Sequence, residues 1–315
     1  MALSKIEWTD VTWNPVTGCT KVSQGCKNCY AETVAKRFWK DRKFTDVVCH
    51  EDRLEQPLHW KKPRMIFVNS MSDLFHEDVP FEFIDRIMTM IAYTNHIYQV
   101  LTKRPKRMLE YFSDSSLRLR LKIYIENLGN KRGYKTKLGD LDPLTLLDNL
   151  WLGVSVEDQK TANERIPILL ETPAAVRWIS AEPLLSSIDI REYLHDSNCL
   201  IKENGNCNCS EPREDHLDWV VVGGESGPKA RECNVFWISD IVGQCKKASI
   251  PVFVKQLGSK GVFEKDDGVI LGAKIIIDGK GKNDKIEDFP EYLKIRQYPR
   301  ELPIERLFYK LLIDK

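Results

Sequence analysis

The chain has 315 residues, of which 47 are Lys or Arg and 46 are Asp or Glu, so its formal net charge is +1. Because 42% of the residues are hydrophobic and 30% are charged, the composition excludes global disorder, a collagen helix and a coiled coil. No uncharged apolar run approaches the length of a bilayer span, and the N-terminal residues lack the apolar segment of a secretory signal. We therefore expect a cytoplasmic protein with no membrane partner.

In chain order, short apolar runs alternate with helical patterns. The apolar runs are rich in β-branched and aromatic residues and end in polar or glycine-containing turns, which is typical of buried parallel strands. They cover 12–14, 65–68, 97–101, 150–154, 176–179, 219–222 and 251–254. Apolar residues at helical spacing predict helices at 31–39, 81–92, 160–170 and 237–248. About seven such units predict an α/β fold, a partial or complete (β/α) barrel, in preference to a doubly wound sheet.

Three segments depart from this alternation. Residues 112–149 are rich in Leu, Lys, Arg and Asn and are predicted to be a helical insertion, whereas residues 192–217 are polar and are predicted to be a loop insertion. We therefore expect a barrel-like domain over 1–258 that contains both insertions. A C-terminal extension over 259–315 should follow and pack on the barrel, with a hairpin-like addition at 269–277.

The most specific local pattern is a cysteine motif near the N-terminus. Cys19, Cys26 and Cys29 follow C-x6-C-x2-C spacing, and in a cytoplasmic protein their thiols are expected to be reduced. Two thiolates at C-x2-C reach one metal centre from a single turn, and three local thiolates suit a [4Fe–4S] cluster with one iron left open. The alternatives are redox thiols and a closed zinc site, which needs a fourth ligand such as Cys49 or His50.

The residues around this motif resemble a known family. Trp13-Asn-Pro-Val-Thr-Gly-Cys19 and Cys26-Lys-Asn-Cys29-Tyr30 are similar to segments of the phage-type three-Cys-motif proteins, which are regarded as radical-SAM-like. Further similar segments follow, so the resemblance spans roughly residues 7–258: Asp52–Pro57, Ile66–His76, Gly153–Glu157, Ser180–Leu185, Asp218–Gly227 and Phe253–Gly258.

The resemblance implies a catalytic domain over 1–258 with a radical-SAM-like partial barrel, which binds a [4Fe–4S] cluster and S-adenosylmethionine (SAM). The chain departs from the mainstream radical-SAM pattern in two places. Its first two cysteines are separated by six residues, where the usual gap is three. Its Gly223-Gly-Glu225 element follows a late strand, whereas the usual Gly-Gly-Glu element follows the second strand, where this chain has Ser70–Asp73. These departures affect the expected SAM contacts more than cluster binding.

Barrel enzymes place their chemistry at the carboxyl ends of the strands. SAM carries an amine and a carboxylate, so its site should offer acidic groups for the amine or the ribose and a Lys or Arg for the carboxylate. We expect Asp73 and Glu157 as acidic contacts and Lys103 or Lys255 as the basic one, with catalytic roles for Lys103, Glu157 and Lys255. The predicted cofactor-binding residues are Tyr30, Asn69, Ser72, Asp73, Ser155, Glu182, Gly223, Gly224 and Glu225. For any one of them the alternative is a solvated strand end, a helix N-cap or a tight βα turn.

Two further features each have two interpretations. Cys199, Cys207 and Cys209 predict either a second metal site or a flexible loop with incidental cysteines. Basic runs such as Lys36–Arg37 and Arg42–Lys43, interleaved with aromatic residues, predict either a nucleic-acid surface or ordinary solvated helix faces.

The cysteine motif and the family resemblance together imply a radical-SAM-like enzyme with a [4Fe–4S] cluster and SAM as cofactors. Its expected substrate is a nucleic acid or a nucleotide, and its expected partner is a flavodoxin- or ferredoxin-like electron donor. The protein itself would supply orientation and exclusion of water. The alternative is a zinc-stabilised module that binds nucleic acid or protein without catalysis.

Overall fold

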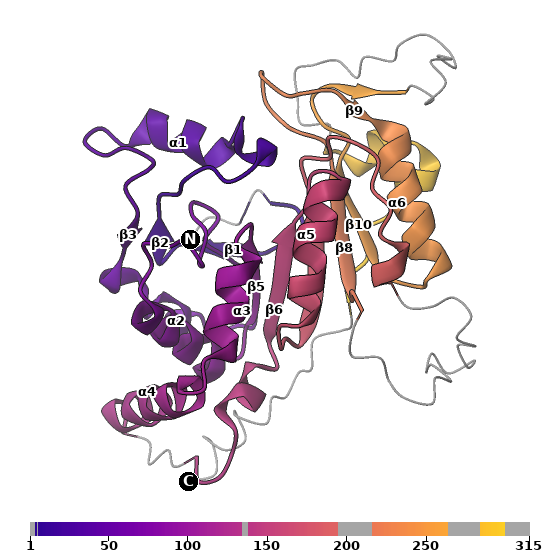
Figure 1. The fold of residues 1–315 in the computed structure, drawn as a ribbon. Helices are drawn as coiled ribbons and strands as arrows, with labels where there is room; N and C mark the ends of the chain where they lie inside the picture. The colour runs from indigo at the N-terminus through magenta and orange to yellow at the C-terminus, as the bar shows by residue number, and fades with distance from the viewer. Residues whose placement is uncertain (1–3, 5, 134–137, 195–215, 264–283, 300–315) are drawn as a thin grey trace, which may run out of the picture.

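The computed structural model describes residues 4, 6–133, 138–194, 216–263 and 284–299. Its centre is a curled sheet of seven strands, each parallel to its neighbour (Figure 1). In spatial order these are β1 (Val11–Trp13), β4 (Met65–Val68), β5 (Ile97–Thr102), β6 (Leu150–Ser155), β7 (Val176–Ala181), β8 (Trp219–Gly223) and β10 (Val252–Gln256). The strands β1 and β10 form the two edges of this sheet. The predicted α/β class is thus confirmed, and the arrangement is compatible with a partial rather than a closed barrel.

All seven predicted strand runs and all four predicted helices correspond to elements of the structure. The helices are α1 (Tyr30–Phe38), α2 (Phe81–Tyr93), α3 (Pro105–Ser113), α4 (Leu117–Lys131), α5 (Gln159–Leu170) and α6 (Val235–Lys247). Helix α5 packs on β6 and β7, and α6 packs on β8 and β10, so helices cover the outer face of the curl (Figure 1). None of the helices in the described part of the chain has the length and apolar character that a membrane span requires.

The remaining elements are short. Strands β2 (Val16–Thr17) and β3 (Val48–Cys49) form an antiparallel pair, and β9 (Cys233–Asn234) lies parallel to β11 (Gly261–Val262). Seven 3-10 helices complete the described residues: η1 (Gln24–Cys26), η2 (Glu51–Arg53), η3 (Gln56–His59), η4 (Pro143–Leu147), η5 (Arg191–Tyr193), η6 (Ile286–Asp288) and η7 (Glu291–Leu293).

The predicted insertions are described only in part. Helix α4 and η4 lie within 112–149, the range predicted as a helical insertion. Most of the predicted loop at 192–217 lies outside the described residues, and so do the hairpin predicted at 269–277 and the cysteines Cys199, Cys207 and Cys209.

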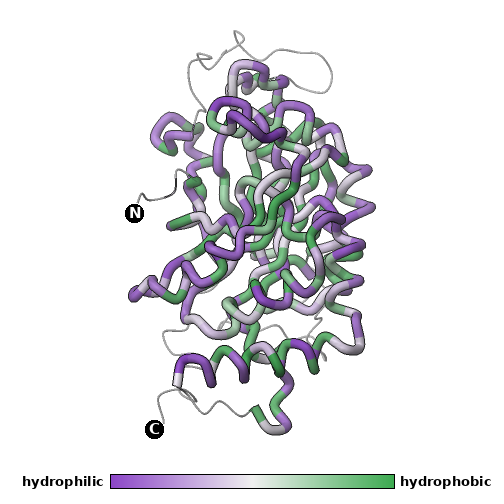
Figure 2. Tube along the Cα trace, turned by 90° about the vertical axis from the view of Figure 1, so that its left-hand side faces the viewer, coloured by the Kyte–Doolittle hydropathy of each residue, from purple (hydrophilic) through white to green (hydrophobic). Residues whose placement is uncertain are grey.

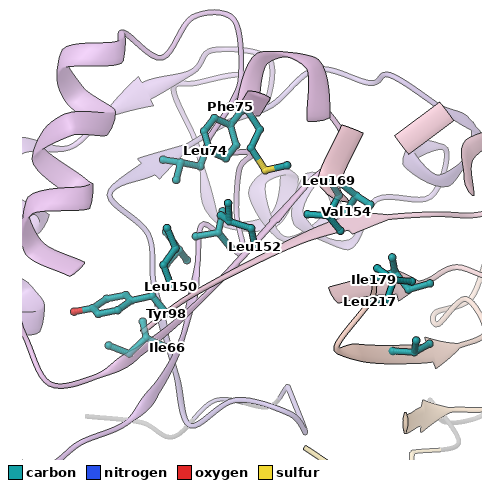
Figure 3. Close-up of a cluster of buried hydrophobic side chains, with 14 of the residues drawn as sticks. Ile66, Leu74, Phe75, Tyr98, Leu150, Leu152, Val154, Leu169, Ile179 and Leu217 are labelled. Atoms are coloured by element: carbon teal, nitrogen blue, oxygen red, sulfur yellow. The ribbon is translucent and has the colours of Figure 1, made fainter. Parts of the chain in front are cut away.

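The outer face of the sheet forms the main hydrophobic core. Successive side chains of a strand point to opposite faces, so every second residue faces the helices. Leu150, Leu152 and Val154 take these positions in β6, and Ile66 of β4 and Ile179 of β7 join the same buried cluster (Figure 3). Figure 2 shows this concentration of hydrophobic residues on the central strands. Burial on this face holds the strands in register, because a slip of one residue would expose the whole set.

The inner face carries aromatic residues at the intervening positions. Five strands each contribute an aromatic residue to a second buried cluster: Phe67, Trp151, Trp178, Trp219 and Phe253. Trp8, from the segment before β1, packs among them with its ring centroid 4.7 Å from that of Phe67 and 5.2 Å from that of Trp178. Aromatic rings therefore fill the concave side of the sheet below the carboxyl ends of its strands.

A C-terminal segment covers the edge strand β10. The Val254 N–H donates to the Ile295 carbonyl at 2.9 Å, and the Gln297 N–H donates to the Val252 carbonyl at 3.0 Å. Tyr298 then stacks on Trp219 with a centroid separation of 5.7 Å. This pairing satisfies backbone groups that an open edge would leave exposed.

Gly153 of β6 is expected to tolerate no side chain. A Cβ at this position would lie 2.5 Å from the indole of Trp178, so Gly153→Ala should lower the free energy of unfolding by about 1–3 kcal/mol through overpacking. Gly243→Ala in α6 is the control, because a Cβ there meets nothing within 4 Å, and it should raise stability by about 0.5–1 kcal/mol. Urea denaturation measures the free energy of unfolding of both variants. A Gly153→Ala variant as stable as wild type would contradict the packing argument.

Candidate functional site

The three motif cysteines lie on one loop between β2 and α1, which we call the cysteine loop (residues 18–29). Gly18 begins it in the left-handed region with φ +95°, and a Cβ there would lie 2.3 Å from the Asp46 carbonyl oxygen, so only glycine fits. The Cys19 N–H then donates to the Phe44 carbonyl at 2.8 Å. Cys26 ends η1, and Cys29 is the N-cap residue of α1.

The cysteine loop is fastened to the end of β6 through Glu157. The Ser23 hydroxyl donates to Glu157 Oε1 at 2.8 Å. Gly25 lies against the same carboxylate, since a Cβ on it would come within 2.3 Å of Oε1. A glycine is therefore needed for this close approach.

A second attachment joins the cysteine loop to the segment after β8. The Asn28 side-chain amide donates to Glu225 Oε2 at 3.0 Å, and Arg231 Nη1 donates to the Gln24 carbonyl at 3.0 Å. Arg231 also contacts Glu225, with Nη2 2.6 Å from Oε1. Burial alone would raise the pKa of Glu225, but Arg231 and Asn28 outweigh it, so the pKa lies below its ordinary value. The loop is thus held from both sides across the carboxyl ends of the strands.

A cavity of about 310 Å³ lies beneath the cysteine loop at these strand ends. Its volume is at the lower end of the range for small-molecule sites. The apolar part of its wall comes from Ile6, Trp8, Phe67, Leu101 and Pro183, and the rest comes from Gly25, Cys26, Asn28, Cys29, Tyr30, Lys103, Ser155, Ser180, Glu182, Gly224, Glu225, Ser226, Lys255 and Gln256. The cavity therefore has an apolar side and a side that carries thiols and both signs of charge.

Nine of the residues predicted from the sequence are brought together in this wall: Cys26, Cys29, Tyr30, Lys103, Ser155, Glu182, Gly224, Glu225 and Lys255. Six others lie outside it: Cys19, Asn69, Ser72, Asp73, Glu157 and Gly223. These nine residues come from the cysteine loop, from the start of α1 and from the carboxyl ends of five strands, β5, β6, β7, β8 and β10, which is the arrangement expected of a barrel-type site.

Asp73 is hydrogen-bonded to residues at the carboxyl end of β5 and does not line the cavity. Its carboxylate accepts from the Thr102 hydroxyl at 2.7 Å, from the Lys103 N–H at 3.0 Å and from Arg104 Nη1 at 3.2 Å. The same Arg104 Nη1 lies 3.6 Å from Cys19 Sγ. Burial raises the pKa of the Cys19 thiol to about 11, with a further increase from Asp73, whereas Arg104 acts in the opposite direction.

Asn69 and Ser72 support the start of the cysteine loop. Asn69 has φ +59°, and its Oδ1 accepts from the Val16 N–H at 3.1 Å. The Ser72 hydroxyl donates to the Gly18 carbonyl at 2.5 Å. Both residues follow β4, so they join that strand end to the loop that carries the thiols.

Glu157 is fully buried beside the cavity wall. Its Oε1 lies 3.0 Å from Lys103 Nζ, and its Oε2 lies 3.2 Å from Arg165 Nη1. Burial alone would raise the pKa of Glu157, but the two cations outweigh it and lower the pKa. Lys103 also donates to the Ser155 hydroxyl, so it links the buried carboxylate to the wall.

Glu182 and Lys255 form a second ion pair, and both belong to the wall. Lys255 Nζ lies 3.1 Å from Glu182 Oε1, and the Ser180 hydroxyl donates to Oε2 at 3.2 Å. Gly223 allows this carboxylate to approach the backbone, because a Cβ there would lie 2.8 Å from Oε1. Gly223 does not line the cavity itself, but it leaves the space that the Glu182 carboxylate occupies in the wall.

The thiols supply donors for an iron–sulfur cluster, although the described residues contain no group of three or more His, Cys, Asp or Glu side chains arranged to hold a metal ion. Three thiols on one short loop are the donor chemistry of a cluster with an open iron. Burial raises the pKa of Cys19, and Cys26 adds a smaller increase to the pKa of both Cys19 and Cys29. Burial is the main cause of the raised pKa of Cys29. The chemistry of the three thiols and their position on one short loop therefore fit an iron–sulfur cluster. The arrangement of their side chains in this structure does not by itself form a metal site.

A family model described as "Protein of unknown function (DUF5131)" matches residues 3–285. The chain belongs to the DUF5131 family. The match includes the cysteine loop and every residue of the cavity wall. No curated protein and no solved structure matches the chain.

Several residues of the site in this DUF5131 protein were not predicted from the sequence. Phe67 and Leu101 could have been found from alternation along their strands, because their inner-face positions follow from period two. Trp8 and Asn28 gave no comparable signal. Each reaches the wall from an irregular segment, and Asn28 meets Glu225 across 197 residues of sequence.

Proposed function

We propose that this protein is a radical-SAM-like enzyme, in which Cys19, Cys26 and Cys29 would hold a [4Fe–4S] cluster and SAM would occupy the cavity. One observation carries the proposal. The thiol-bearing loop is fastened over the carboxyl ends of parallel strands, and two of its thiols face a cavity with charged groups on its other walls. When bound, such a cluster would supply the electron that cleaves SAM reductively and starts radical chemistry.

The charged wall is suited to the methionine end of SAM. Lys103 and Lys255 offer ammonium groups for its carboxylate, and Glu182 and Glu225 offer carboxylates for its amine or ribose hydroxyls. This assignment differs from the preference based on sequence, which gave the acidic contacts to Asp73 and Glu157. Both of those carboxylates already accept from buried partners and lie outside the wall.

The apolar wall is suited to the adenine ring and to the exclusion of water. Trp8, Phe67 and Leu101 present apolar surface on this side, where a planar base gains from burial and stacking. Exclusion of water would protect a reactive intermediate from side reactions. The substrate expected from the sequence, a nucleic acid or a nucleotide, stays a prediction.

Anaerobic reconstitution with iron and sulfide tests the proposal. We expect a brown protein that contains iron and sulfide and that releases 5′-deoxyadenosine only when both SAM and dithionite are present. The same protein without SAM is the control for background release. A colourless protein with stoichiometric zinc and no release would overturn the proposal in favour of a metal-stabilised binding module.

A further inference from the structure

Arg104 brings a buried positive charge into contact with one thiol of the cysteine motif. It lies after β5 as the N-cap residue of α3, and its side chain is 5% exposed. Its Nη1 donates to Cys19 Sγ at 3.6 Å. Neither Arg104 nor Cys19 lines the cavity, so this contact is separate from whatever the cavity binds.

The guanidinium of Arg104 has partners on each of its nitrogens. Its Nη1 also donates to Asp73 Oδ2 at 3.2 Å, and its Nε donates to Glu77 Oε2 at 2.9 Å. Its Nη2 donates to the Thr20 hydroxyl at 2.8 Å and to the Thr20 carbonyl at 3.2 Å. Because an arginine presents its N–H donors in a rigid planar fork, these contacts fix both the position and the orientation of the group that faces Cys19.

The same network holds the residue that follows Cys19. Thr20 Oγ1 lies 2.8 Å from His76 Nε2, and His76 is buried. The Asp78 N–H donates to His76 Nδ1 at 3.1 Å, so the proton of the neutral ring lies on Nε2 and is donated to Thr20. Arg104 and His76 thus both hold Thr20 in place.

The charge of Arg104 persists in this buried position. Burial alone would lower the pKa of Arg104, but Asp73, Cys19 and Glu77 outweigh burial, so the pKa lies above its ordinary value. At the Cys19 sulfur the Asp73 carboxylate disfavours negative charge, whereas Arg104 favours it by its charge and by its hydrogen bond. Loss of Arg104 would therefore remove a group that offsets Asp73 at this sulfur.

Reduction would change the charge next to this sulfur. The [4Fe–4S] cluster of the proposed function gains one electron from an external reductant and no proton, so its charge becomes more negative by one. A hydrogen bond to a ligand sulfur and a cation beside it stabilise the reduced form more than the oxidised form, which raises the reduction potential.

We propose that Arg104 is a positioning residue that raises the reduction potential of the cluster through its contact with Cys19 Sγ. This inference rests on the proposed function. Arg104 acts through a ligand of the cluster and lies outside the cavity wall. Its function is to make the uptake of the electron that starts the reaction less unfavourable.

Two variants of Arg104 and one matched control test this role. Arg104→Gln removes the charge and the planar fork, and Arg104→Lys keeps the charge as the conservative rescue. The control is Arg120→Gln on α4, which also takes a cation from a buried carboxylate, since Arg120 Nε lies 2.7 Å from Oδ2 of the fully buried Asp85. Reconstituted protein is titrated anaerobically with dithionite and redox mediators, and the EPR signal of the reduced cluster measures the fraction reduced.

At the solution potential that half-reduces wild type, we expect the ratio of reduced to oxidised cluster to be about tenfold lower in Arg104→Gln, which is a midpoint about 59 mV more negative. Arg104→Lys should stay within about threefold of wild type, because the charge remains. Arg120→Gln should have the wild-type midpoint, although it loses stability. Iron content is measured in every sample, because a merely structural role of Arg104 would lower the iron bound and leave the potential of the remaining cluster unchanged.

Equal midpoint potentials in wild type and Arg104→Gln would overturn the role of Arg104, and so would an equal shift in Arg120→Gln. Because Arg104→Gln leaves Asp73 without its buried cation, the change is repeated in an Asp73→Asn background, where that buried charge is absent. There too Arg104→Gln should lower the ratio about tenfold relative to Asp73→Asn alone, and equal potentials in this pair would overturn the role even if the single variant does not fold. Failure of the proposed function gives a different result, a wild-type protein that forms no iron–sulfur chromophore.

Discussion

Alanine at Cys19, Cys26 or Cys29 should abolish iron binding and SAM cleavage together while the protein stays folded. A cluster with one open iron has three protein ligands, so the loss of any thiolate leaves too few. All three side chains are partly exposed and none belongs to the main or the inner-face core cluster. We therefore expect the free energy of unfolding to change by less than about 1 kcal/mol. Iron content, visible absorbance and 5′-deoxyadenosine release measure the first effect, and urea denaturation measures the second.

Two other thiols serve as controls for the cysteine variants. Cys49 of β3 is partly exposed, and Cys49→Ala should keep both the iron and the activity, which also tests whether it completes a four-ligand zinc site. Cys245 of α6 is buried in the main core, so Cys245→Ala should lower stability without loss of iron. Intact chromophore and turnover in all three motif variants would contradict the assignment of the cluster ligands.

The strands could be predicted from sequence because both faces of the sheet are buried. In β8, Val220 and Val222 join the core beneath the helices, while Trp219 and Val221 join the aromatic cluster inside the curl. Burial on both faces makes a continuous apolar run, and such a run with a glycine turn after it is a strong strand signal. For the same reason polar residues just after the runs, such as Lys103 and Ser155, could be placed at the carboxyl edge.

The direction of each polar side chain at that edge could not be predicted. Ser155 is the last residue of β6 and faces the cavity, but Glu157 lies beyond the strand, where period two no longer applies. Asp73 likewise turns back to the backbone of Lys103. A carboxylate at the end of a strand can meet a ligand or anchor a loop, and only the position of its cationic partners decides between them.

The attachments of the cysteine loop depend on contacts between residues far apart in the sequence. Ser23 meets Glu157 across 134 positions, and Arg231 meets Gln24 across 207. Local patterns carry no information about such pairs, because neither hydrophobic period nor turn chemistry links them. The thiol motif was therefore visible in the sequence, whereas its placement over the sheet was not.

Glutamine at position 157 should produce the largest loss of stability among the charged residues of the site. Glu157 has no exposed surface and lies within 3.2 Å of both Lys103 and Arg165. Removal of its charge leaves two cations without their buried partner, and breaking a buried pair in this way costs about 3–5 kcal/mol. The matched control is Glu164→Gln on α5, whose 3.9 Å pair with Lys160 is exposed on both sides and should contribute less than about 1 kcal/mol.

The effect of Glu157→Gln should depend on pH with a definite sign. Because the folded-state pKa of Glu157 is lowered, its contribution to stability is complete above the ordinary carboxyl pKa and is lost as the pH falls through the folded-state value. The difference in unfolding free energy between wild type and Glu157→Gln should therefore be full at neutral pH and shrink in acid, whereas Glu164→Gln should show little change. Urea denaturation over this pH range measures it, and equal stability of wild type and Glu157→Gln at neutral pH would show that this carboxylate does not fasten the cysteine loop to β6.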